Sequence, residues 1–244
     1  MHRFAVFCGV VLLVLACGAT AALAQVPDKF TNLKVLPKDM PKRELMDVMR
    51  SFTAALGVSC DHCHVSKNDV DDFASDDKAP KRTARAMLQM AGEINQRLLP
   101  AAGLESPMQV RCITCHRGVT KPQTLDQVMT AEITKGGVAG ATARYRELRG
   151  QYYGSGSYDF GPRTLNNVAE TLARGQNDID GALELLKLNE EFNADKIDTH
   201  LAVGQLYAMK GNTDAAVASI ERALKIDPEN ERAKQMLERI RAPK

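Results

Sequence analysis

The fold is decided by Cys60-Asp61-His62-Cys63-His64 and by a second copy of the same pattern, Cys112-Ile113-Thr114-Cys115-His116. Both copies match C-x-x-C-H, the attachment signature of a c-type haem. Two thiols at this spacing reach the two vinyl groups on one edge of a porphyrin, and the adjacent His lies under the iron as an axial ligand. We therefore predict two covalently bound haem c groups, with covalent attachment through Cys60, Cys63, Cys112 and Cys115 and proximal iron ligation by His64 and His116.

Other uses of paired cysteines have to be weighed against haem. Two C-x-x-C pairs also fit a tetrahedral zinc site, structural disulfides in an oxidising compartment or a redox dithiol. None of these uses explains why a His follows both pairs immediately. Haem attachment is therefore the preferred interpretation of the two motifs.

The N-terminus has the features of a secretory signal peptide over residues 1–24. A basic start is followed by an apolar run over residues 4–16 and by the small-x-small tripeptide Ala22-Leu23-Ala24. Cys17 ends a stretch that resembles a degenerate lipobox, so lipidation at Cys17 and an uncleaved anchor remain alternatives to cleavage. In each case we expect a periplasmic or otherwise exported protein, which would meet a membrane only through such a lipid or anchor.

The composition is that of a soluble globular protein. The 244 residues are 44% hydrophobic and 25% charged, and the formal net charge of +2 gives no indication of a nucleic-acid partner. There is no Trp, and aromatic residues make up 5% of the chain. The core must therefore be built from aliphatic residues, and a bound cofactor would supply some of the missing apolar volume.

Each attachment motif follows a predicted amphipathic helix. Apolar residues recur at helical spacing over residues 41–56, and Gly57 ends this helix shortly before the first motif. The same spacing over residues 80–99 predicts a second helix, which Pro100 ends. Both haems are therefore expected to lie beside a helix that precedes their cysteines.

The distal ligands can be narrowed by counting histidines. Outside the leader the chain contains four histidines, namely His62, His64, His116 and His200. Because His64 and His116 are the predicted proximal ligands, too few histidines are left to build two bis-His haems. Methionine is the natural sixth ligand and raises the reduction potential of a haem. The two helices carry Met46, Met49, Met87 and Met90, and the alternative role of these residues is ordinary core packing.

Four stretches of the chain fit a repeating unit of helix, turn and C-x-x-C-H: Leu56-Gly57-Val58-Ser59-Cys60-Asp61-His62-Cys63-His64-Val65, Arg85-Ala86-Met87-Leu88-Gln89-Met90, Glu93-Ile94-Asn95 and Cys112-Ile113-Thr114-Cys115-His116-Arg117-Gly118. From Asn32 to about Pro122 the chain thus resembles the cytochrome c subunit of photosynthetic reaction centres. The resemblance implies distal ligation by Met49 at the first haem and Met87 at the second, with Met46 and Met90 as the fallback positions. That family binds four haems, whereas this chain has two attachment motifs.

The C-terminal third contains an internal repeat. One copy fits the tetratricopeptide pattern of about 34 residues at Val203-Gly204, Tyr207, Gly211, Ala216, Ile220, Ala223 and Pro228, and a weaker copy precedes it. Residues 231–241 predict a final amphipathic helix that caps the array. The expected fold is all-α, with a signal peptide at 1–24, a dihaem domain at 26–122, a linker at 123–137 and a tetratricopeptide-like domain at 138–244. The linker is expected to contain one short helix near Leu125 to Thr134.

These features predict an electron carrier rather than an enzyme, because a six-coordinate His/Met iron has no open position for a substrate. Redox proteins are the expected partners, and the repeats would dock a protein or peptide. Two alternatives remain: a dihaem peroxidase-type enzyme, and a haem-bearing scaffold or sensor that acts through its repeats. The aspartates at 69–77 are interpreted as a solvated loop in preference to a calcium site.

Overall fold

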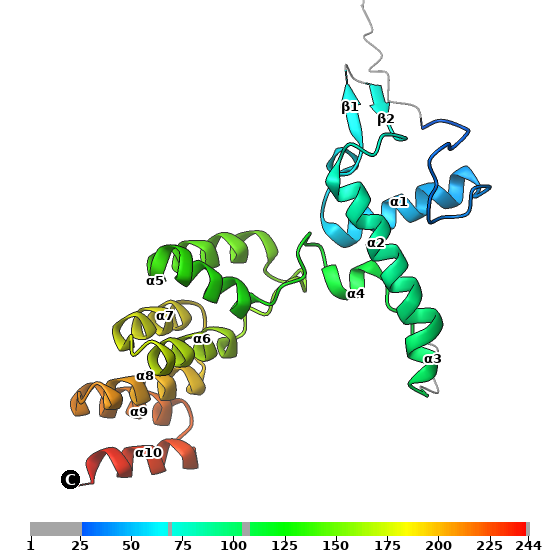
Figure 1. The fold of residues 1–244 in the computed structure, drawn as a ribbon. Coiled ribbons are helices and arrows are strands. Elements are labelled where there is room, and N and C mark those ends of the chain that lie inside the picture. Colours follow the sequence, from blue (N-terminus) through cyan, green and yellow to red (C-terminus); the bar gives the residue numbers. More distant parts are fainter. Residues whose placement is uncertain (1–25, 68–69, 104–107, 243–244) are drawn as a thin grey trace, which may run out of the picture. The chain divides into compact units, whose positions relative to one another are not determined.

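The computed structural model describes residues 26–67, 70–103 and 108–242, and the chain forms two compact units (Figure 1). The first unit contains residues up to 42 together with residues 60–89, and the second contains residues 43–59 and 90–244. The predicted leader at 1–24, with Cys17, lies outside the described residues. None of the described helices is long and apolar enough to cross a membrane.

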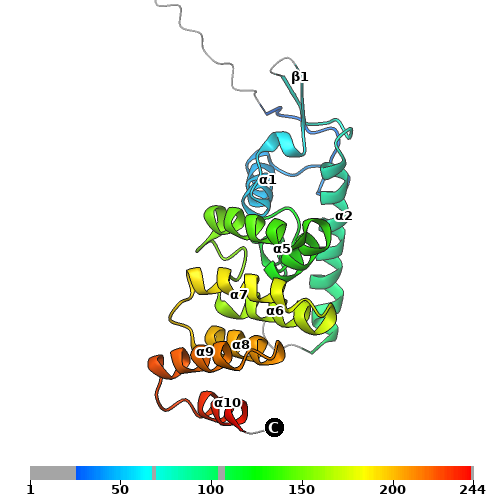
Figure 2. The same cartoon turned by 90° about the vertical axis from the view of Figure 1, so that its left-hand side faces the viewer.

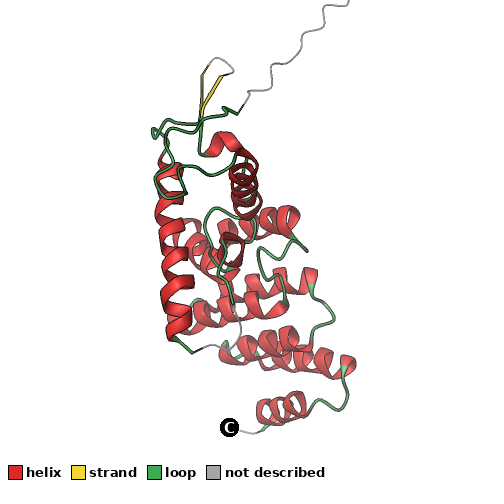
Figure 3. Cartoon of the chain, turned by 90° about the vertical axis from the view of Figure 1, so that its right-hand side faces the viewer, coloured by secondary structure: helices red, strands yellow, loops and turns green. Residues whose placement is uncertain are grey.

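In the first unit the chain turns back directly after the first motif. The 3-10 turn η1 (Cys60–His62) is followed by strands β1 (Val65–Lys67) and β2 (Val70–Asp72). The two strands pair antiparallel, with Val65 opposite Asp72. Figure 3 shows this hairpin in an otherwise helical chain. The all-α prediction is confirmed for the fold as a whole, and the short hairpin is an addition that the sequence did not reveal.

The carboxylate of Asp76 ties three segments of the first unit together. Asp76 accepts hydrogen bonds from Lys34 Nζ at 2.6 Å, from Arg85 Nη1 at 2.7 Å and from Asn32 Nδ2 at 2.9 Å. Lys34, together with Arg85, holds the pKa of this carboxyl well below its ordinary value. Within the described residues, no group of three or more His, Cys, Asp or Glu side chains could hold a metal ion. Asp76 therefore has a structural role in the segment that was predicted to be a solvated loop.

The helices that precede the motifs are α1 (Lys42–Leu56) and α2 (Ala79–Glu93). Gly57 follows α1 with φ +66°, as a glycine that ends a helix does. The prediction that Pro100 ends the second helix is wrong, because α2 continues through a π-turn, η2 (Ile94–Leu98), into α3 (Leu99–Ala101). Pro100 lies in the first turn of α3, where its missing N–H is tolerated.

The second motif forms the short helix α4 (Cys112–His116), and α5 (Leu125–Tyr152) follows it. The predicted linker at 123–137 contributes the first half of α5, and its Leu125 and Met129 are fully buried. Gly137, with φ 69° and ψ −174°, interrupts the helical backbone between the two halves. Both halves pack in the same core as the helices that follow.

Two helix pairs and a final helix make up the repeats. They are α6 (Pro162–Gly175) with α7 (Ile179–Phe192), α8 (Ile197–Met209) with α9 (Thr213–Ile226), and α10 (Glu231–Arg241). Figure 2 shows them stacked in chain order. Asp178 and Asn212, one repeat apart, cap α7 and α9 by accepting hydrogen bonds from the N–H groups of Gly181 and Ala215. The caps therefore recur with the repeat.

Small residues let the paired helices of the second repeat approach closely. A side chain added at Gly204 would meet Ile220 Cδ1 at 2.5 Å and the Ala216 carbonyl oxygen at 3.3 Å. Ala216 and Ala223 are fully buried. The repeat core is thus close-packed at α8 and α9, where glycine is the largest residue that fits position 204.

Polar side chains join the first repeat to the second. Asn189 is fully buried; its Nδ2 donates to the Pro162 carbonyl within the first repeat at 2.8 Å and to Thr199 Oγ1 of the second repeat at 3.3 Å. His200 is also buried, with Nδ1 3.0 Å from Glu190 Oε1 and Nε2 2.9 Å from the Ala194 carbonyl. His200 is therefore a packing residue whose two ring nitrogens are both engaged.

Candidate functional site

The first motif is wound into a helical turn by its own backbone. The N–H groups of Cys63 and His64 both donate to the Cys60 carbonyl, at 3.2 and 3.0 Å. This turn places Cys60 and Cys63 on the same side, because residues three apart on a helix are neighbours. Lys78 Nζ donates to the Asp61 carbonyl and anchors the turn within the first unit.

His64 lies half-buried beside the hairpin, close to Phe73 and to the charged side chains of Lys81, Asp71 and Lys78. The edge of Phe73 packs against the imidazole, with ring centroids 5.1 Å apart. Burial lowers the pKa of His64, so the ring is neutral at neutral pH, which is the form that ligates a metal. Nδ1 is buried and has no hydrogen-bond partner in the described structure. A neutral imidazole directly after the two thiols of its motif suits a proximal ligand.

The four motif cysteines are present as thiols. None of them forms a disulfide in the described structure, and Cys60 and Cys115 are exposed. Burial raises the pKa of the Cys63 thiol. Thiols in two C-x-x-C pairs, each followed directly by a His, fit covalent attachment of a porphyrin.

In the second motif, α4 is capped on both sides. The Arg111 N–H donates to Thr114 Oγ1 at 3.0 Å, which fixes the entry to the helix. Arg117 adopts a left-handed conformation with φ 49°, and the Val119 N–H donates to the His116 carbonyl at 3.0 Å. The motif is therefore a rigid single turn that ends at His116.

The orientation of His116 is set by its own chain. Nδ1 lies 3.0 Å from the Val119 carbonyl, and a carbonyl can only accept, so Nδ1 carries the proton. This leaves the lone pair on Nε2, the nitrogen at the far side of the ring. Histidines that ligate metals use the same arrangement, in which the second nitrogen donates to a carbonyl and fixes the tautomer.

The exit of the second motif is held by two other parts of the second unit. The Gly118 N–H donates to the Ala55 carbonyl of α1 at 2.8 Å. Gly57 lies so close that a side chain there would collide with the Gly118 carbonyl. From the loop before α6, the buried Ser157 Oγ donates to the Arg117 carbonyl at 2.6 Å. The second attachment helix is thus built into the same unit as the repeats.

Apolar side chains around the motifs are largely exposed. No residue of α2 is buried. In the second unit the exposed large apolar side chains include Met90 at 49%, Leu98 at 44%, Met108 at 55% and Ile113 at 42%. An apolar group of porphyrin size would cover such surface, so the apolar surface, the thiols and the His116 tautomer all fit a haem.

The methionine predictions are not decided by this geometry. Met49 and Met46 lie half-buried on α1 in the second unit, whereas the first motif lies in the first unit. Met87 belongs to the first unit, whereas Met90 and the second motif belong to the second. The pairing of each methionine with an iron therefore stays a prediction.

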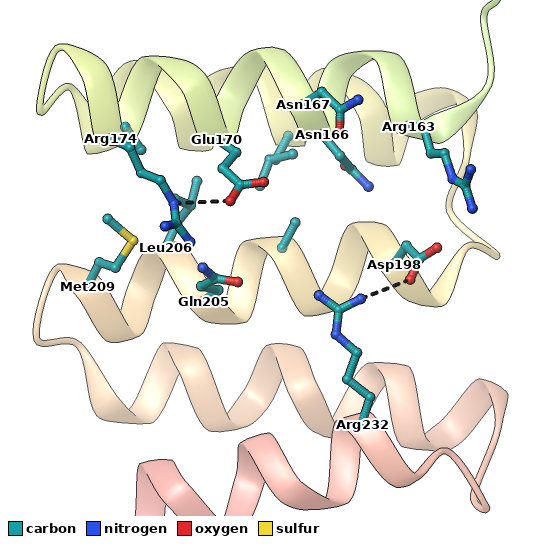
Figure 4. A pocket seen from close by; sticks show the side chains of 13 residues that line it. Arg163, Asn166, Asn167, Glu170, Arg174, Asp198, Gln205, Leu206, Met209 and Arg232 are labelled. Atoms are coloured by element: carbon teal, nitrogen blue, oxygen red, sulfur yellow. Dashed lines mark ion pairs between the residues drawn. The ribbon is translucent and has the colours of Figure 1, made fainter.

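A second candidate site is a groove of about 340 Å³ along the repeats (Figure 4). Helices α6 and α8 supply most of its lining, with Leu186 from α7 and Arg232 from α10. Arg174 pairs with Glu170 at 3.0 Å and Arg232 with Asp198 at 3.6 Å, whereas Arg163 makes no ion pair in the described structure. Three guanidinium groups against two carboxylates give the groove a positive excess, which favours an anionic occupant.

Sequence reasoning missed several residues that support the motifs. Phe73 packs on His64, and Ser157 and Asn95 bind backbone next to the second motif. Only Asn95 carried a signal, since it stood in a stretch that resembles the reaction-centre family. The other two act through contacts between segments that no local pattern joins.

Comparison with known proteins agrees with these features. The family described as "photosynthetic reaction centre cytochrome C subunit" matches residues 16–160, which end just before α6. Cytochrome c-554 of Chloroflexus aurantiacus is 31% identical over 97 residues. The match covers 39% of this chain and 22% of that relative's length, so the chain spans about a fifth of the relative.

Two solved structures resemble the repeats. One is described as the first TPR of Spaghetti (RPAP3) bound to the HSP90 peptide SRMEEVD, at 19% identity and a TM-score of 0.32. The other is the first TPR domain of the human RPAP3 protein, at 18% identity and a TM-score of 0.33. Each match covers 48% of this chain and 86% of the solved chain. With TM-scores this low, the repeat fold rests on the helix packing of the chain itself.

Proposed function

Because the chain belongs to the photosynthetic reaction centre cytochrome c subunit family, we propose that it is an exported electron-transfer protein with two covalently bound haem c groups. Cys60 and Cys63 would hold one haem, with His64 as proximal ligand. Cys112 and Cys115 would hold the other, with His116. When bound, each haem carries one electron by cycling between its ferric and ferrous states.

The observation that carries the proposal is the hydrogen bond between His116 Nδ1 and the Val119 carbonyl at 3.0 Å. It fixes the tautomer that presents Nε2 as a ligand, at the end of a helix that also carries two free thiols. A structural disulfide would not require this orientation of a His that follows the cysteines, and a zinc site would not require a His directly after both pairs.

The remaining chain residues would tune the site. Met49 and Met87 are the proposed distal ligands, with Met46 and Met90 one helical turn away as the fallbacks. Methionine ligation raises the potential and closes the sixth position, which favours electron relay over reaction with substrate. The protein would thus provide ligation, burial and spacing, while no substrate bond is broken.

The proposal is tested by the intact mass of the protein made in a host with haem-attachment machinery. We expect the chain from Gln25 plus two haems, which would support both attachment sites and export. Replacing Cys112 and Cys115 by Ser should leave one haem, and also replacing Cys60 and Cys63 should leave none. A wild-type mass without haem would refute the proposal, and a lipid on Cys17 would change only the localisation.

A second role, docking of an acidic partner on the repeats, is favoured by the positive excess of the groove. Arg163 and Asn167 lie on α6 and make no side-chain hydrogen bond or ion pair in the described structure, so their donors are available. An extended segment rich in Asp and Glu would pair with them. Since Arg163 is six residues from Ser157, a partner held there would be near the chain that contacts the second motif.

Binding of a fluorescent Asp/Glu-rich peptide, compared with its Asn/Gln counterpart, tests the docking role. We expect Arg163→Glu to weaken binding of the acidic peptide by about tenfold, equivalent to roughly 1.4 kcal/mol. Arg222→Glu is the matched control, because Arg222 is exposed on α9 and lies outside the groove. Equal binding by both variants, or equal affinity for both peptides, would rule the docking role out.

A further inference from the structure

The π-turn η2 changes the register of the helix that follows α2. Its defining hydrogen bond runs from the Leu99 N–H to the Ile94 carbonyl, five residues back rather than four. The turn therefore contains one residue more than an α-helical turn, and π-turns of this kind occur frequently at functional sites. Asn95, the second residue of this turn, is partly buried.

Asn95 pairs with the backbone of Val110 through both ends of its side-chain amide. Nδ2 donates to the Val110 carbonyl at 2.8 Å, and the Val110 N–H donates to Oδ1 at 2.7 Å. Both lengths are those of good hydrogen bonds. The side chain thus makes the two bonds that a neighbouring strand would make, and reversing the amide would place donor against donor.

The pairing fixes the residue that leads directly into the second motif. Arg111 follows in an extended conformation with φ −114° and ψ 165°, and its N–H is bound by Thr114 Oγ1. Cys112 comes next and begins α4. The backbone N–H groups of Val110 and Arg111 are therefore both hydrogen-bonded, and the position of Cys112 depends on Asn95 of the π-turn η2.

We propose that Asn95 is a positioning residue for the second haem: it holds the segment before Cys112 so that the thiols and His116 meet one porphyrin in the required geometry. The inference rests on the proposed haem-binding function and adds a residue outside the attachment motif. Few side chains can replace Asn95. Ala makes neither bond, and Asp can only accept, which leaves the Val110 carbonyl facing a carboxylate.

The experiment uses a parent protein in which Cys60 and Cys63 are replaced by Ser, so that the second haem is observed alone. Asn95→Ala, Asn95→Asp and the control Gln96→Ala are made in this parent. Gln96 is exposed in the same π-turn and makes no side-chain hydrogen bond in the described structure. Haem content is read from intact mass, ligation from the ferric spin state, and the midpoint potential from a redox titration.

We expect Asn95→Ala to reduce haem content, or to give a haem with a high-spin fraction and a lowered midpoint potential, because loss of methionine ligation lowers the potential. Asn95→Asp should give a smaller change in the same direction, and Gln96→Ala none. If Asn95→Ala fails to fold, Asn95→Asp decides the question. Haem content, spin state and potential equal to those of Gln96→Ala would overturn the inference.

Failure of the proposed function would be visible separately. A parent protein without any haem would refute attachment at Cys112 and Cys115 and say nothing about Asn95. A parent with one normal haem, together with an unaltered Asn95 variant, would refute only the positioning role.

Discussion

Replacing Gly57 by Ala should damage the contact between α1 and the exit of the second motif. Gly57 has φ +66°, a conformation that costs an L-residue about 1–2 kcal/mol. The new methyl group would also collide with the Gly118 carbonyl, lying 3.0 Å from its carbon and closer still to its oxygen. The colliding atoms belong to the backbone, so no side-chain rotation can relieve the overlap.

The cost can be worked out from these contacts. Restoring ordinary contact requires α1 and α4 to separate by on the order of 1 Å. That movement breaks the bond from the Gly118 N–H to the Ala55 carbonyl, a net loss of about 1 kcal/mol. With the backbone strain and the overpacking, the free energy of unfolding should fall by roughly 3–5 kcal/mol. At about 2–4 °C per kcal/mol, the Tm should fall by roughly 10 °C.

Thermal unfolding of the haem-loaded protein, followed by circular dichroism, measures this loss. The matched control is Gly211→Ala, because Gly211 has φ +79° and open space where its Cβ would lie. In the control, the free energy of unfolding should fall only by the cost of the left-handed backbone, about 1–2 kcal/mol. If Gly57→Ala melts no lower than Gly211→Ala, the close approach of α1 to the second motif is not a structural constraint and the reasoning is refuted.

Three further predictions concern the two units. Lys34 and Arg85 lower the pKa of Asp76 in the folded protein. The ionised Asp76 carboxylate therefore stabilises the fold fully above the unfolded pKa of ~3.9, and this stabilisation is lost as the pH falls through the lower folded pKa. The Tm of Asp76→Asn should therefore lie below wild type at pH 7 and approach it as the pH is lowered; a gap that does not change with pH would contradict this. Gly204→Ala should lower the free energy of unfolding, measured in urea, by about 1–3 kcal/mol. Ile220→Val removes Cδ1, so the Gly204→Ala/Ile220→Val double variant should lose less stability than the sum of the two single losses. Strict additivity of the two losses would contradict the overlap. Asn189→Ala should cost about 3 kcal/mol in the same assay because it leaves the Pro162 carbonyl and other buried groups unpaired; a loss below about 1 kcal/mol would contradict that role.

The helices that flank the motifs could be predicted because their signals are local. Apolar spacing and Gly57 gave the bounds of α1 to within a residue, since a helix face and a left-handed end are encoded within a few residues. The tetratricopeptide-like helices followed from their period, because each repeat must present the same small residues to its partner.

Other local features were hidden by competing signals. Pro100 favours a helix end, but it lies in the first turn of α3, where its missing N–H is tolerated, and the helix runs on to Ala101. The residues at 123–137 looked like a linker because Lys, Pro, Gly and Thr surround them, whereas burial of Leu125 and Met129 makes them part of the repeat core. In the second case packing outweighs residue preference.

The sequence by itself determined the chemistry of the attachment sites and the helical character of the chain. Two C-x-x-C-H motifs specify thiols and an imidazole at fixed spacing, and this information is complete within five residues. Only the tertiary structure decided what supports the motifs: Phe73 beside His64, Asn95 on Val110, Ser157 on Arg117 and Gly57 against Gly118. These contacts join segments far apart in the chain, and their existence depends on how whole helices pack, which no periodicity or local preference encodes.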